Sequence, residues 1–168
     1  GITGAVSGLA SGGSATSDLS AVATDDADVA ISVTDSTGTI TAADLSAVGG
    51  STTGTVTVAN AQTITGTAAE ATAALVTSGT KVVLNAASTV TVSDATAVAT
   101  ASALAGVTNA TVGFTNGITG AVTDLLSSGS ASTALAAVLV DDADVAITLA
   151  DTSIDAANVV TLDGIASG

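Results

Sequence analysis

Seven residue types are missing from this chain of 168 residues: arginine, cysteine, histidine, methionine, proline, tryptophan and tyrosine. Without cysteine, the chain can form neither disulfide bonds nor thiolate metal sites. Without histidine as well, the commonest proton shuttle, the imidazole metal ligand and the thiol nucleophile are excluded. Paired carboxylates can serve a glycosidase, but Phe114 is the only aromatic residue available to hold a sugar. We therefore expect a protein that is not an enzyme.

Positive charge is almost absent too. Lys81 is the only cationic side chain, against fifteen acidic residues, and the formal net charge is −14. Such a surface repels nucleic acid and anionic membranes, because proteins bind both through basic residues. No apolar run approaches the ~20 residues of a membrane-spanning helix. We expect no nucleic-acid partner and no membrane insertion, and an attraction for divalent cations.

What the chain does contain is an internal repeat. Residues 1–36 are identical to residues 117–152 at 22 of 36 positions, which defines a super-repeat of 116 residues, 1–116, with a second copy that begins at 117. Self-similarity of this kind predicts a repeat architecture. We expect one elongated segment over residues 1–168. The chain opens on glycine and its second copy stops part-way, so we also expect it to be an internal fragment of a longer repeat array.

A shorter unit recurs inside the long one. Alternating apolar runs are followed by a second short run and then by an alanine-rich segment, a pattern typical of strand, strand and short helix. The second runs, which we place in one column, give coils of 24 to 38 residues and are marked by Ile2, Ile40, Ile64, Val90, Ile118 and Ile154. The predicted fold is an α/β right-handed repeat solenoid, with parallel strands stacked coil on coil and a short helix per coil. Its predicted core comprises inward strand residues and three leucines: Val29, Ile31, Val56, Val58, Val82, Leu84, Val112, Val145, Ile147, Leu45, Leu75 and Leu104.

Helix starts carry recognisable capping residues. Thr67 and Glu70 fit the capping box, in which each side chain accepts from a free amide of the first turn. Thr41 and Asp94 stand where N-caps of the following alanine-rich segments are expected.

The strongest ligand candidates are two copies of an acidic motif. The motif consists of Asp25, Asp26 and Asp28 in the first copy, and of Asp141, Asp142 and Asp144 in the second. Carboxylates alternating in a turn can supply part of the oxygen shell of Ca²⁺, so calcium is the candidate metal. The alternative is a solvated acidic turn that blocks unwanted strand pairing. The motif recurs only once per super-repeat, so it cannot form a column of calcium ions along the body.

Threonine pairs give a further candidate surface. A Thr-x-Thr pattern falls on the second strand of three consecutive coils, at Thr39/Thr41, Thr63/Thr65 and Thr89/Thr91. Aligned threonine pairs on a flat face are how several ice-binding proteins present themselves. Threonine is also simply a good strand residue.

The repeats at residues 29–35, 65–75 and 89–95, rich in Ala, Thr, Val, Gly and Asp, resemble tandem repeats of large secreted bacterial surface proteins. These are the S-layer-like and giant adhesin-like proteins exported by type I systems, including cyanobacterial ones. The resemblance implies an extracellular location, an extended filament or surface layer, and calcium dependence. We expect a structural segment of such a fibre or layer that assembles with copies of itself through coil stacking, as a homopolymer or end to end. The alternative is a non-polymerising adhesin stalk that presents a separate binding domain, with cell-surface glycans as candidate partners, and a third function is ice binding.

Overall fold

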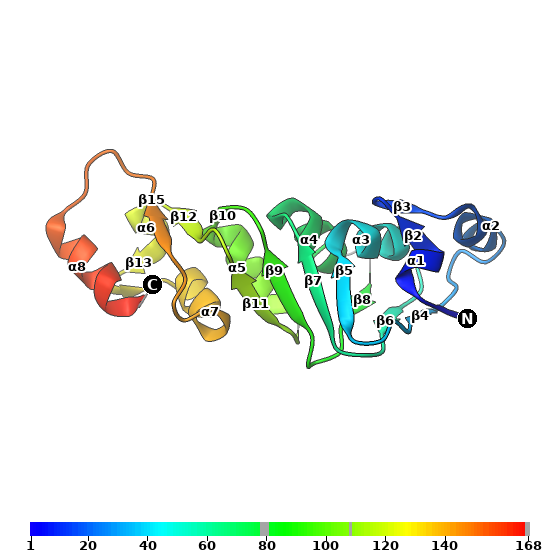
Figure 1. Ribbon diagram of the computed structural model, residues 1–168. Helices are drawn as coiled ribbons and strands as arrows, with labels where there is room; N and C mark the ends of the chain where they lie inside the picture. Colours follow the sequence, from blue (N-terminus) through cyan, green and yellow to red (C-terminus); the bar gives the residue numbers. More distant parts are fainter. Residues whose placement is uncertain (78–80, 108, 167–168) are drawn as a thin grey trace.

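The computed structural model describes residues 1–77, 81–107 and 109–166. The molecule is elongated, with the first copy of the repeat at one end and the second at the other (Figure 1). Its helices are α1 (Val6–Leu9), α2 (Ser17–Asp25), α3 (Ala42–Gly50), α4 (Ala68–Leu75), α5 (Val98–Val107), α6 (Val122–Leu125), α7 (Thr133–Asp141) and α8 (Ala156–Ile165).

The strands are short and mostly parallel. They are β1 (Ile2–Gly4), β2 (Ala10–Ser11), β3 (Ser14–Ala15), β4 (Ile31–Val33), β5 (Gly38–Thr41), β6 (Val56–Val58), β7 (Gln62–Gly66), β8 (Val82–Val83), β9 (Thr89–Val92), β10 (Thr96–Ala97), β11 (Thr111–Phe114), β12 (Ile118–Gly120), β13 (Leu126–Ser127), β14 (Ser130–Ala131) and β15 (Ile147–Leu149). Parallel pairing builds three sheets, ordered β1-β4-β6-β8, β11-β9-β7-β5 and β10-β12-β15. β2 with β3 and β13 with β14 form two antiparallel hairpins.

The predicted solenoid is wrong, because the strands divide among several small sheets and do not stack as one continuous series of coils. The register shows why. Ile2 pairs with Ile31, and Ile118 pairs with Ile147. From the sequence spacing, Ile2 and Ile118 were predicted to stack with Ile40, Ile64 and Val90, the second strands of the coils. In the structure they pair instead with β4 and β15, which are first strands of their coils. Ile154, the last residue of that column, lies outside any strand. The fold is therefore a mixed α/β arrangement of short sheets and helices.

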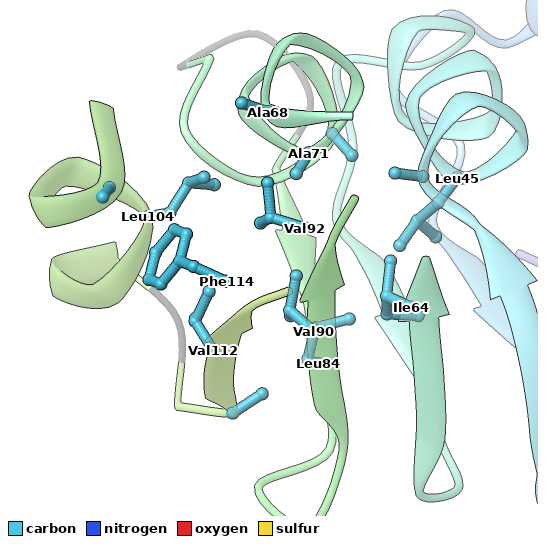
Figure 2. Close-up of a cluster of buried hydrophobic side chains, with 14 of the residues drawn as sticks. Leu45, Ile64, Ala68, Ala71, Leu84, Val90, Val92, Leu104, Val112 and Phe114 are labelled. Carbon is cyan, nitrogen blue, oxygen red and sulfur yellow. The ribbon is translucent and has the colours of Figure 1, made fainter. Parts of the chain in front are cut away.

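The core lies between the sheets and a row of helices, where α3 packs on α4 and α4 packs on α5. Figure 2 shows Ile64, Val90 and Val112 of successive strands together with Leu104 and Phe114. Most of the predicted core is confirmed, since these members are buried: Val29, Ile31, Val56, Val58, Leu84, Val112, Val145, Leu45 and Leu104. Val82, Leu75 and Ile147 are only half-buried.

Local capping follows the sequence in two of three cases. Thr41 caps α3 by accepting from the Asp44 N–H, and Thr67 with Glu70 forms the predicted capping box of α4. The prediction that Asp94 caps the helix after it is wrong. Its carboxylate accepts the N–H of Ala68, the first residue of α4, at 2.6 Å. In the described ranges no helix is long and apolar enough to cross a membrane.

Candidate functional site: the repeated acidic motif

The acidic motif lies at the end of a helix in both copies of the repeat. Helices α2 and α7 begin alike, because Thr16 and Ser132 each accept a hydrogen bond from the N–H three residues later. The motif then starts on the last helical residue, Asp25 in α2 and Asp141 in α7. The helix that carries the motif has the same bounds and the same type of N-cap in both copies. The two motifs differ in the elements that pack around them.

In the second copy the motif closes the edge of a sheet. Among the described residues, β11 pairs with β9 on one side only, and on that side the Thr115 N–H donates to the carbonyl of Val92. On the other side, the Phe114 N–H donates to Oδ2 of Asp142 at 2.7 Å. An open parallel edge otherwise invites another strand to pair. The Asp142 carboxylate occupies one of its donors, which agrees with the interpretation of the motif as a block to strand pairing.

Asp141 lies deeper than Asp142. Burial raises the pKa of the Asp141 carboxyl above its ordinary value of 3.8, a hydrogen bond from the Val112 backbone lowers it, and the neighbouring charge of Asp142 raises it again. Its Oδ2 atom is buried and has no hydrogen-bond partner among the described residues. Together, Asp141 and Asp142 face the outward N–H groups of Val112 and Phe114, two residues apart on one strand.

The motif of the first copy faces solvent. Asp25, Asp26 and Asp28 are exposed, and no hydrogen bond to their carboxylates is found in the described part of the chain. Asp144 of the second copy is exposed too. Across residues 1–77, 81–107 and 109–166, no three acidic side chains come close enough together to hold a metal ion. The calcium site expected at the two motifs therefore gains no support from geometry and stays a prediction.

Other aspartates cap helices that are distant in the sequence. The Val6 N–H at the start of α1 donates to Asp35 at 2.7 Å, and the Val122 N–H at the start of α6 donates to Asp151 at 2.7 Å. The N-cap positions of both helices are alanines, which offer no side-chain acceptor. A carboxylate at a helix N-terminus satisfies a free amide and complements the helix dipole. Each aspartate lies 29 residues further along the chain than the amide it caps.

Sequence reasoning missed these long-range caps, although a signal was present. In three places an aspartate stands two residues after a strand ends, at Asp35, Asp94 and Asp151. The spacing carries the carboxylate past the end of its strand to a helix start on a neighbouring unit. Helix capping therefore accounts for part of the high aspartate content of this chain.

The threonine pairs form aligned ranks on one sheet. Thr39, Thr63, Thr89 and Thr111 are in register across β5, β7, β9 and β11, and a second rank comprises Thr41, Thr65 and Thr91. The residues between the ranks are buried, so the threonines lie on the outward face. The hydroxyls of Thr89 and Thr63 are 3.3 Å apart.

A groove that we name the C-terminal groove lies between β15 and α8 at one end of the molecule. It is open to solvent and lined by Ile147, Leu149, Val159, Leu162, Asp163 and Ala166. Comparisons with protein families, with curated proteins and with solved structures give no match to this chain.

Proposed function

We propose that this chain is a structural repeat segment of an extracellular filament, fibre or surface layer, that it is not an enzyme, and that it self-associates. The observation that carries the proposal is the pairing of an internal repeat with an elongated body (Figure 1). A unit that stacks on its own copies grows along one axis and forms no single enclosed cleft.

The chemistry of the side chains supports a structural role. The chain has neither histidine nor cysteine, and the described carboxylates whose partners are known accept hydrogen bonds from backbone amides. An active site, in contrast, brings a nucleophile, a base and an oxyanion donor together around a pocket. A strongly acidic surface also keeps a long repetitive protein soluble through self-repulsion.

Electron microscopy of the purified chain tests the proposal. Over a rising concentration series, at moderate salt to screen the net charge, the chain should form thin filaments or ordered sheets. A parallel series with a calcium chelator shows whether assembly requires divalent ions. Isolated short rods at every concentration would contradict the proposal and favour the adhesin stalk.

Ice binding is a second candidate, favoured by the registered threonine ranks. Strand spacing fixes the distance between neighbouring threonines of one rank at ~4.8 Å, and the two ranks lie two residues apart along each strand, about 6.6 Å. The result is a regular array of threonines on the outward face, of which Thr39, Thr41, Thr89 and Thr111 are exposed and Thr63, Thr65 and Thr91 are half-buried. An array of this kind can order water at fixed spacings.

Thermal hysteresis measures this second function. Thr63 lies in the middle of its rank and faces outward, so Thr63→Lys should abolish hysteresis. Thr24→Lys, on the exposed side of α2, is the matched control and should leave it unchanged. No hysteresis in the unmodified chain would eliminate ice binding.

A further inference from the structure

Three asparagines hold neighbouring units of the repeat together. The side-chain amides of Asn60, Asn85 and Asn116 each donate to a backbone carbonyl that lies 23 to 26 residues earlier in the chain, at 2.6 to 2.9 Å. Each of the three lies between two strands: β6 and β7, β8 and β9, and β11 and β12. The same type of bond therefore joins successive units at three places along the body.

Asn116 differs from the other two in the residue that follows it. Gly117 comes next, whereas Asn60 and Asn85 are each followed by an alanine. Of the five asparagines in the chain, Asn116 alone precedes a glycine. Because glycine has no Cβ, its backbone nitrogen can approach the side-chain carbonyl of the preceding residue with the least hindrance.

The fold exposes Asn116 to water but restrains the turn that contains it. The Asn116 side chain is exposed, in the turn between β11 and β12. Its Nδ2 atom donates to the carbonyl of Ser93 at 2.6 Å, and the Gly117 N–H donates to the carbonyl of Phe114 at 2.9 Å. The Gly117 nitrogen is therefore available for reaction only when the turn opens, so the folded chain should react more slowly than the unfolded chain.

We propose that Asn116 and Gly117 form a site of spontaneous deamidation in the folded chain. The backbone nitrogen of Gly117 attacks Cγ of Asn116, and the new C–N bond closes a succinimide ring. The side-chain nitrogen of Asn116 leaves as ammonia and takes with it the proton that the Gly117 nitrogen loses. The proximity of the two groups favours this intramolecular step. The inference is independent of the proposed structural function.

Water then opens the succinimide at either of its two carbonyls. Addition at Cγ leaves an ordinary aspartate at position 116, and addition at the backbone carbonyl leaves an isoaspartate, in which the chain runs through Cβ and Cγ. In both cases one water is consumed and one ammonia has been released. The reaction adds one negative charge to a chain whose net charge is already −14.

Both products remove the bond between the units. An ionised carboxylate accepts hydrogen bonds but donates none, so it repels the Ser93 carbonyl to which Asn116 donated. Isoaspartate also lengthens the backbone where space is short, because even a Cβ on Gly117 would collide with the carbonyl of Ala146. The next residue, Ile118, is completely buried. Deamidation should therefore loosen β12, where the second copy of the repeat begins.

Mass spectrometry of aged samples tests the proposal. Folded chain, and chain unfolded in guanidinium chloride, are incubated at the same mildly alkaline pH. Fragmentation of the intact protein then locates each conversion of an amide to an acid, and labelling with isoaspartyl methyltransferase detects isoaspartate. Asn60 is the internal control, since it is exposed and makes the same type of bond between units. Ala61→Gly is the matched variant, because it places a glycine after Asn60.

Asn116 should convert several-fold faster than every other asparagine of the folded chain, and faster again in the unfolded chain. In Ala61→Gly, Asn60 should become reactive as well. Thermal unfolding of aged chain and of Asn116→Asp should show a lower Tm than that of fresh chain. The proposal would be overturned if the folded chain stayed unconverted at Asn116 while the unfolded chain reacted, or if Asn60 of the unmodified chain converted equally fast. An unchanged Tm after conversion would overturn the loosening of β12.

Discussion

Asp142 and Asp26 occupy the same position in the two copies of the acidic motif, but only Asp142 accepts a hydrogen bond from a strand edge. Replacing each of them in turn tests whether that bond stabilises the fold. Asp142→Ala removes the acceptor of the Phe114 N–H, a bond of 2.7 Å to a carboxylate at a buried residue. Hydrogen bonds to charged groups contribute about 1.5–3 kcal/mol, so unfolding should become easier by about that amount. For a chain of this size each kcal/mol shifts Tm by about 2–4 °C, giving a fall of roughly 3–12 °C.

The internal repeat supplies the control for this prediction. Asp26 occupies the same position of the motif but is exposed, and its carboxylate has no hydrogen-bond partner in the described part of the chain. In dilute, monomeric samples, Asp26→Ala should therefore change the free energy of unfolding by less than about 0.5 kcal/mol. Urea and thermal unfolding of both variants give the comparison. Equal losses would show that the motif acts within its own turn and would refute the edge-closing role of Asp142.

Three further predictions concern stability. Gly117→Ala should destabilise by about 2–3 kcal/mol, because φ is +71° and a Cβ would collide with the Ala146 carbonyl. Gly106 is exposed at the next-to-last position of α5 with open space around it, so Gly106→Ala should change stability by less than about 0.5 kcal/mol; urea unfolding measures both, and similar values would be inconsistent with strain at Gly117. Ile64→Asp places a charge in the fully buried core and should cost more than about 4 kcal/mol, so an unchanged Tm would contradict the core assignment. Because burial raises the pKa of Asp141, the folded chain holds that proton more tightly, and this residue's contribution to stability falls as pH rises from below its ordinary pKa through the raised value. Asp141→Asn should therefore gain stability relative to the unmodified chain as pH rises from below the ordinary pKa of 3.8, and urea unfolding that shows a constant difference across that rise would disprove the shift.

Local structure was predictable from the sequence because it depends on near neighbours. Apolar alternation located β4, β6 and β7, and the caps at Thr41 and Thr67 follow from side chains that bond within one turn. The hairpins were missed although their signal was present. Gly12 and Gly13 both have positive φ, as a two-residue hairpin turn requires.

Long-range arrangement was not predictable from spacing alone. Ile2 and Ile40 were predicted to occupy equivalent positions because both are isoleucines in short apolar runs. Strand pairing in the folded chain places Ile2 beside Ile31 instead. Asp94 illustrates the same limit, since a carboxylate after a strand can cap the helix that follows or one on a neighbouring unit. For the acidic motif, the sequence located the residues. Only the fold separates Asp142, which closes a strand edge, from the exposed Asp26.

Amide hydrogen exchange, resolved by residue, tests most directly the claim that the second copy of the acidic motif closes the outward edge of β11. In the unmodified chain, the outward amides of Val112 and Phe114 should be protected. In Asp142→Ala, the Phe114 amide should exchange much faster. Fast exchange at Phe114 in the unmodified chain, or unchanged protection in Asp142→Ala, would contradict the account.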